Sequence, residues 1–211
     1  MLKIYRYTTN EYLEQWYKDD GKHSMVFQPV SKYTNIDNIR KDPLEGVAYY
    51  MPDETEITLN DMILPCRDFS VGMSVENFMI ACFSTVYSKE LCDRFQADCV
   101  LEGEIGHNIE RWSFDVVNDT VRENLRFYPG RVCYKNKTVH NSEHFPRDAM
   151  FQQTLFTKCE NYAMENEFRI VWDVPQSLLD STKTRNSDKV GLNSVSLKLT
   201  PVKQWKLLPK L

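Results

Sequence analysis

Glycine is scarce in this sequence, and its scarcity excludes the commonest ways of holding a phosphate group. Only seven of the 211 residues are glycine, and neither a Gly-x-Gly-x-x-Gly nor a Gly-x-x-x-x-Gly-Lys-Ser/Thr pattern occurs. Loops of these kinds bind nucleotides because glycine lets backbone N–H groups approach the phosphates closely. If this protein binds a nucleotide, it must do so with side chains.

Long apolar runs and closely paired cysteines are also missing. The most apolar stretch, Phe78 to Val86, is far shorter than the about 20 residues needed to cross a bilayer, and the N-terminus lacks the apolar core of a signal peptide. The six cysteines form no Cys-x-x-Cys pair, which favours reduced thiols. We therefore expect a cytoplasmic protein with no membrane partner.

The composition indicates a folded protein of modest charge. Hydrophobic residues make up 42% of the chain and aromatic residues 12%, which is typical of a globular domain. The formal net charge of -4 argues against a strongly basic nucleic-acid-binding surface.

The apolar pattern predicts one α+β domain over residues 1–211, with a mixed, mainly antiparallel sheet core and a few short helices. Two polar stretches, about 31–54 and about 181–194, are expected to be loops. Helices are expected after Asn10, from Ser88 to about Ala97, and from Pro146. Strands are expected at 2–8, 25–30, 55–64, 78–86, 112–117, 126–128, 132–134, 138–139 and 163–172, and residues 195–199 with 202–208 are expected to form a closing strand and tail.

The stretch 163–172 carries the strongest functional pattern. If it is a strand, Glu165, Glu167 and Arg169 share one face, while Phe168, Ile170 and Trp172 lie on the other. Charged side chains in a row are costly to remove from water, so the row either binds something or faces solvent as surface ion pairs. Judged alone, the pattern favours the solvent-facing interpretation.

Polar groups at two other strand positions change this balance. Arg6 shares a strand face with Leu2 and Ile4, so it is expected to point inward and to need a partner. Ser84 and Thr85 come at the end of the most apolar strand. Each also has an ordinary structural explanation, a salt bridge for the arginine and a backbone hydrogen bond for the hydroxyls.

Taken in order, Tyr-Arg, Phe-Ser-Thr and Glu-x-Glu resemble the arginine-serine-glutamate class of ADP-ribosyltransferases. The resemblance implies that NAD is bound as substrate, with Arg6 on its phosphate and ribose and Ser84 on the nicotinamide ribose. Glu167 would bond the ribose 2′-hydroxyl, and Glu165 would position or deprotonate an unknown acceptor, protein or nucleic acid. Thr85 belongs to the same NAD-binding set, and either Tyr87 or Tyr162 would stack on nicotinamide.

A second resemblance covers more of the chain. The sequence is similar to a bacterial and phage family of unassigned function, and the likeness is carried by Ile4 to Tyr7, Asp42-Pro43-Leu44-Glu45, Ile80 to Ser84, Lys158 and Glu165 to Arg169. Members usually carry a Trp-x-x-Tyr after Cys-Phe-Ser, which this chain lacks. Together the likenesses imply an NAD-cleaving transferase that acts as a toxin, in phage defence or as a phage effector.

Other functions stay open. A non-catalytic binding protein of a phage or defence system fits the same residues. A metal-dependent nuclease could use Glu165, Glu167 and Asp173 with Lys158 as a phosphate contact. His140 and His144 lack an evident third ligand, so we predict no metal site there.

Overall fold

The computed structural model describes most of the expected elements. The described residues are 1–16, 24–30, 42, 45–51, 55–60, 62–66, 70–74, 78–105, 114–115, 126–139, 147–174, 183–186, 189–192, 195–199 and 205–211. Within them the chain is a mixed α+β protein made mainly of antiparallel strands with a few short helices, as predicted. The candidate histidines at 140 and 144 and most of the stretch 31–54 lie outside the described residues.

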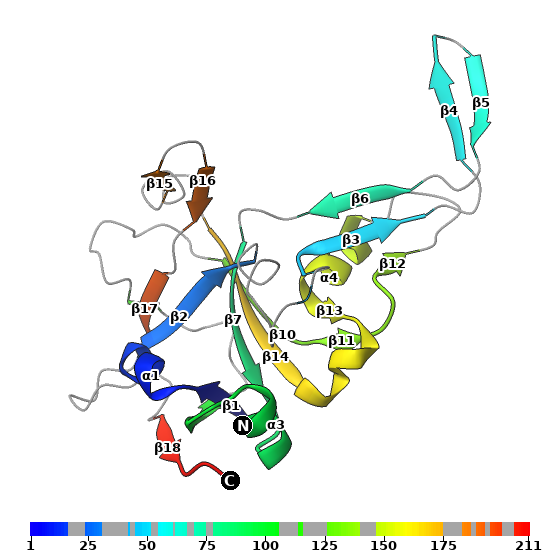
Figure 1. The fold of residues 1–211 in the computed structure, drawn as a ribbon. Coiled ribbons are helices and arrows are strands. Elements are labelled where there is room, and N and C mark those ends of the chain that lie inside the picture. The colour runs from blue at the N-terminus through cyan, green and yellow to red at the C-terminus, as the bar shows by residue number, and fades with distance from the viewer. Residues whose placement is uncertain are drawn as a thin grey trace.

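A nine-stranded sheet carries most of the core (Figure 1). Its main path runs through β18 (Lys206–Leu208), β8 (Cys99–Ile105), β1 (Leu2–Thr8), β7 (Phe78–Ser84), β2 (Ser24–Pro29), β17 (Val195–Leu199) and β9 (Phe114–Asp115). β14 (Glu167–Asp173) lies between β7 and β10 (Arg126–Arg131). The central strand is therefore β7, which pairs with β14 along its whole length, with β2 near its start and with β1 at its end.

The two faces of β14 have different surroundings. Phe168, Ile170 and Trp172 are buried in the main apolar cluster, as their alternation predicts. Other members of that cluster come from the neighbouring strands and from Trp205, and they include Ile4, Val26, Phe27, Met79, Ala81, Phe83, Leu101 and Ile105. The opposite face of β14 carries Glu167, Arg169 and Val171. Two of these three side chains are charged, so this face is the candidate for a functional site.

A smaller group of elements covers that opposite face (Figure 1, right-hand side). It comprises the three-stranded sheet of β12 (Thr138–Val139), β3 (Val47–Tyr50) and β6 (Val71–Ser74), the helix α4 (Arg147–Phe156), the parallel pair β11 (Cys133–Tyr134) and β13 (Thr157–Lys158), and the 3-10 helix η2 (Glu160–Glu165). Leu155 and Phe156 of α4 pack against Ile80 and Val171. Glu167 and Arg169 of β14 thus lie between the nine-stranded sheet and this smaller group of elements.

The remaining elements include one confirmed cap. Helix α3 (Lys89–Arg94) starts where Ser88 accepts a hydrogen bond from the Leu91 N–H, as the sequence predicts. Helix α1 (Asn10–Trp16) follows β1, also at the expected place.

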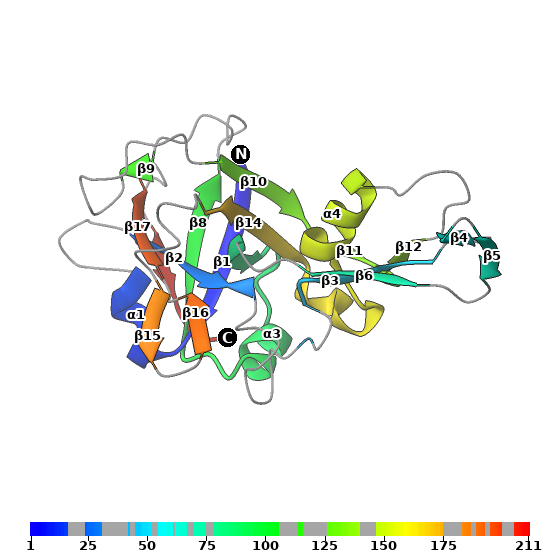
Figure 2. The same ribbon diagram turned by 90° about the horizontal axis from the view of Figure 1, so that it is seen from above.

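Three expectations about loops and strands are wrong. The stretch expected to be a loop at 181–194 contains the antiparallel pair β15 (Lys183–Asn186) and β16 (Lys189–Leu192), and the loop expected at 31–54 contains β3. The single strand expected at 55–64 is a hairpin of β4 (Thr55–Leu59) and β5 (Met62–Cys66), which extends away from the other elements (Figure 2). No helix in the described part of the chain has the length and apolar character that crossing a bilayer requires.

Candidate functional site

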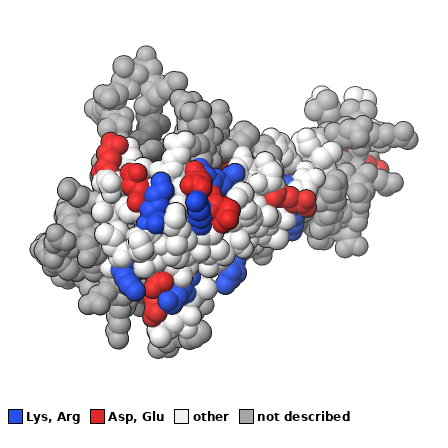
Figure 3. Space-filling model, turned by 60° about the horizontal axis from the view of Figure 1, so that its bottom comes forward, with Lys and Arg blue, Asp and Glu red and all other residues white. Residues whose placement is uncertain are grey.

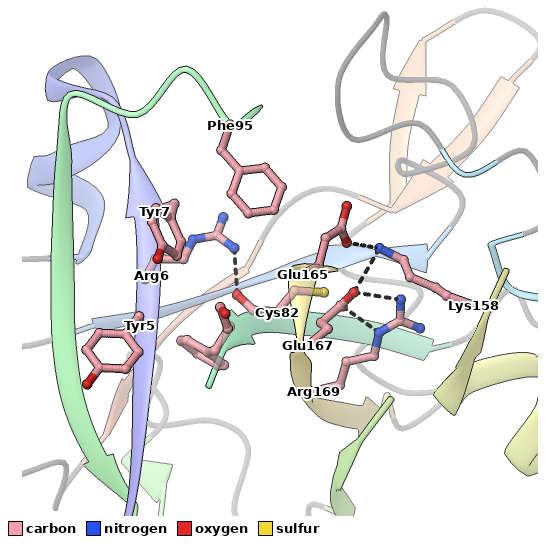
Figure 4. A pocket seen from close by; sticks show the side chains of 11 residues that line it. Tyr5, Arg6, Tyr7, Cys82, Phe95, Lys158, Glu165, Glu167 and Arg169 are labelled. Atoms are coloured by element: carbon pink, nitrogen blue, oxygen red, sulfur yellow. Dashed lines mark hydrogen bonds and ion pairs between the residues drawn. The ribbon is translucent and has the colours of Figure 1, made fainter. Parts of the chain in front are cut away.

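Three of the sequence motifs meet on three adjacent strands. In the antiparallel ladders, Tyr5 of β1 lies beside Ser84 of β7, and Ser84 lies beside Glu167 of β14. A pocket opens at this row, with Arg6 and Phe95 on one side and the charged side chains on the other (Figure 4). Its lining consists of Tyr5, Arg6, Tyr7, Cys82, Phe83, Ser84, Phe95, Lys158, Glu165, Glu167 and Arg169.

Glu165 does not lie on the strand, which corrects the expected strand at 163–172. It ends the 3-10 helix η2, and the strand β14 starts only at Glu167. Between them Asn166 adopts a left-handed conformation, with φ 43° and ψ 51°. With this turn between them, both carboxylates contact the same cation. The Lys158 Nζ lies 2.8 Å from Glu165 Oε2 and 2.8 Å from Glu167 Oε2.

The left-handed turn gives a testable prediction. We expect Asn166→Val to lose about 1–2 kcal/mol of unfolding free energy, because a β-branched side chain clashes with the backbone in this conformation. Asn166→Gly, which tolerates positive φ, serves as the matched control and should change stability by less than about 0.5 kcal/mol. Urea unfolding measures both. Equal losses in the two variants would mean that the turn is not the source of the effect.

Arg169 is the centre of a buried ion-pair network. Its Nη1 and Nη2 donate to the two carboxylate oxygens of Glu45 at 2.7 and 2.6 Å, and its Nε donates to Glu167 Oε1 at 2.6 Å. A further bond from Nη1 reaches the Leu155 carbonyl at 2.6 Å. Glu45 is placed by a turn in which its N–H donates to the Asp42 carbonyl. The two-pronged contact with Glu45 is the geometry that a guanidinium favours.

This arrangement contradicts the solvent-facing interpretation of the Glu-x-Glu-x-Arg pattern. Glu165, Glu167 and Arg169 are only 4%, 5% and 1% exposed. Asp42 and Lys137 are also buried, and the Lys137 Nζ lies 4.0 Å from Asp42 Oδ2. Burial of this many charges is tolerated because each carboxylate lies against a cation.

The paired charges keep the site ionised. Burial alone would raise the pKa of Glu167, but Arg169 and Lys158 outweigh it and hold that pKa well below its usual range. Burial opposes the charge of Lys158, yet Glu167 and Glu165 raise the pKa of Lys158 above its ordinary value. Burial raises the pKa of the Cys82 thiol strongly, and the charge of Glu167 adds to this. Glu167 is therefore a carboxylate and Cys82 a neutral thiol at physiological pH.

Tyr134 supports Glu167 from the backbone side. Its hydroxyl accepts a 2.7 Å hydrogen bond from the Glu167 N–H. Burial raises the pKa of Tyr134 to about 12, so the hydroxyl stays protonated. This contact joins β11 to the first residue of β14, and no sequence pattern indicated it.

Arg6 and Ser84 line the pocket as the sequence suggests, whereas Thr85 does not. The Arg6 Nη1 donates to the Cys82 carbonyl at 2.7 Å, and the Ser84 Oγ accepts from the Val86 N–H at 3.0 Å. Thr85 donates from its Oγ1 to the Asn166 carbonyl at 3.1 Å, which ties the end of β7 to the left-handed turn. Its role in this structure is to hold the turn.

Neither candidate stacking tyrosine lies in the pocket lining. Tyr87 stacks on Tyr5 with ring centroids 5.7 Å apart, and its hydroxyl donates to the Pro209 carbonyl. Tyr162 lies under two cations, with its ring centre 5.2 Å from Lys158 Nζ and 5.6 Å from Arg94 Cζ. The rings that do line the pocket are those of Tyr5, Tyr7, Phe83 and Phe95.

The carboxylates of the nuclease alternative do not all lie together, because Asp173 is far from Glu165 and Glu167. Asp173 lies at the opposite end of β14 from Glu167, opposite Phe78 of β7. Six residue steps along the strand place the Cα atoms of Glu167 and Asp173 about 20 Å apart, far beyond the reach of one metal ion. Within the described residues, no group of three or more His, Cys, Asp or Glu side chains is placed to hold a metal.

One face of the molecule carries charges of both signs. On the face shown in Figure 3, acidic and basic side chains of the described residues are interspersed, without a broad patch of one sign.

Comparison with known proteins adds no further constraint. No protein-family model, curated protein sequence or solved structure matches the chain. The two family likenesses of the motifs accordingly stay predictions.

Proposed function

We propose that the protein is an NAD-dependent ADP-ribosyltransferase that cleaves the nicotinamide glycosidic bond and transfers ADP-ribose to an acceptor. One observation carries the proposal. The arginine, serine and glutamate motifs, far apart in sequence, come from adjacent strands, and Arg6, Ser84, Glu165 and Glu167 line the same pocket.

The chemistry suits these residues. As the bond from the ribose C1′ to nicotinamide breaks, its electron pair leaves with nicotinamide and positive charge builds on the ribose. A fixed, ionised carboxylate stabilises that charge, and Glu167 is held ionised by Arg169 and Lys158. The acceptor then bonds to C1′ and gives its proton to Glu165. Arg6 supplies the phosphate contact for which the chain has no glycine loop.

A second candidate is a non-catalytic binding protein, and one observation favours it. Both oxygens of Glu167 are already engaged, Oε1 by Arg169 Nε at 2.6 Å and Oε2 by Lys158 Nζ at 2.8 Å. A carboxylate neutralised in this way stabilises an oxocarbenium ion less than an unpaired one does. Under this alternative the network is scaffolding for a partner surface, and NAD is not cleaved.

A comparison of two cations on β1 tests the NAD site. We expect Arg6→Gln to raise KM for NAD about tenfold or more, because it removes a charge-assisted contact to phosphate. Lys3→Gln is the matched control: Lys3 lies on the same strand, pairs with Glu102 at 3.2 Å and is outside the pocket lining. Nicotinamide release against NAD concentration measures both. The same KM in the two variants would remove Arg6 from the NAD site.

A further inference from the structure

The pocket is too small for the ligand that the proposed function requires. The cavity volume is about 50 Å³. Pockets that bury a small organic ligand usually enclose about 300–1,000 Å³. A group as large as a nucleotide can enter only if side chains at the edge of the pocket move.

One ion pair links the two sides of the pocket. Phe95 and Glu165 lie on opposite sides of the pocket (Figure 4). Arg94, the residue before Phe95, donates from its Nε and Nη2 to Glu165 Oε1 at 3.2 and 3.0 Å. The contact therefore joins the end of α3 to the end of η2, next to the lining residue Phe95 and at the lining residue Glu165.

The two ion pairs of Glu165 are unequal. The Arg94 side chain is 26% exposed, whereas that of Lys158 is 8% exposed and also contacts Glu167. A partly exposed pair contributes little stability, while breaking a buried pair is costly. Opening must therefore begin at Arg94, with Glu165 still held by Lys158.

The rest of α3 is anchored, which confines the movement to side chains. Leu91 and Cys92 are buried with Tyr7, Ala97 and Val100. The ring of Phe95 packs against Tyr7 at 5.5 Å between centroids. When Arg94 turns toward solvent, the ring of Phe95, the residue that follows α3, still lines the pocket.

We infer that the Arg94–Glu165 ion pair is a gate that controls access to the pocket. An entering ligand breaks this pair, and the freed Oε1 of Glu165 then faces the newly opened space. The inference rests on the proposed function only for the identity of the entering ligand.

Thiol labelling measures the gate without any assumption about NAD. Cys82 lines the pocket, Cys133 is exposed and Cys92 is fully buried, so the three report pocket access, reagent activity and unfolding. We expect Arg94→Gln to raise the rate of iodoacetamide labelling at Cys82, relative to Cys133, by about two- to fivefold, the factor that loss of one partly exposed ion pair implies. Peptide mass spectrometry resolves the sites.

The controls make the result decisive. Removing the Arg94 charge disfavours the Cys82 thiolate, so a faster reaction at Cys82 with no change at Cys92 reports better access to the pocket. Lys3→Gln removes an exposed ion pair outside the pocket lining and should leave the ratio unchanged. An unchanged ratio in Arg94→Gln, or a parallel rise at Cys92, would overturn the gate. Because no NAD is present, this outcome is independent of whether nicotinamide is released.

Discussion

Replacing Arg169 with methionine is expected to lower the unfolding free energy by about 3–5 kcal/mol, the usual cost of removing one member of a buried ion pair. The variant keeps the bulk of the side chain but leaves Glu45 without the two hydrogen bonds that the guanidinium gives it. Glu167 loses its 2.6 Å contact and keeps that with Lys158. Urea unfolding followed by circular dichroism measures the loss.

A matched control separates burial from the mere loss of an arginine. Arg131 is exposed and donates to Thr85 Oγ1 at 3.3 Å, so Arg131→Met should change stability by less than about 0.5 kcal/mol. Adding Glu45→Met to Arg169→Met should recover part of the loss, because it removes the stranded carboxylate. A loss below about 1 kcal/mol for Arg169→Met alone would show that the network contributes little.

Replacing Glu167 with glutamine is expected to lower kcat for nicotinamide release by about 10²–10³, the usual effect of removing one group that stabilises transition-state charge. The shape of the side chain is kept, so KM for NAD should change by less than about threefold. Steady-state rates over a range of NAD concentrations give both constants.

The control for this substitution is Glu102→Gln. Glu102 lies on β8, pairs with Lys3 and is outside the pocket lining. We expect this variant to keep the wild-type kcat. If Glu167→Gln turns over NAD as fast as wild type, Glu167 has no role at the ribose, and the binding-protein alternative is preferred.

Local patterns of the sequence predicted the parts of the site that depend on alternation. The apolar run of β7 and the alternation of Phe168, Ile170 and Trp172 predicted two core strands, because one face of each is buried in the main cluster. The inward position of Arg6 and the place of Ser84 at a strand end followed from the same rule. These residues do line one pocket.

The rest depends on features that periodicity does not contain. A strand pattern cannot show that Asn166 is left-handed, although asparagine tolerates that conformation better than most residues do. The contact between Glu45 and Arg169 joins residues 124 positions apart, so only the folded chain reveals it. The hairpin of β4 and β5 did leave a signal, since Asn60 and Asp61 separate two runs that each read as a strand.

The most direct test of the central claim is nicotinamide release from NAD by the purified wild-type protein, with and without cell lysate as a source of acceptor. We expect release that increases with lysate, together with covalent attachment of ADP-ribose to a lysate component. Release without attachment would mean that water is the acceptor and the protein is an NAD hydrolase. No release under either condition would contradict the account and leave the Arg169 network as the scaffold of a binding surface.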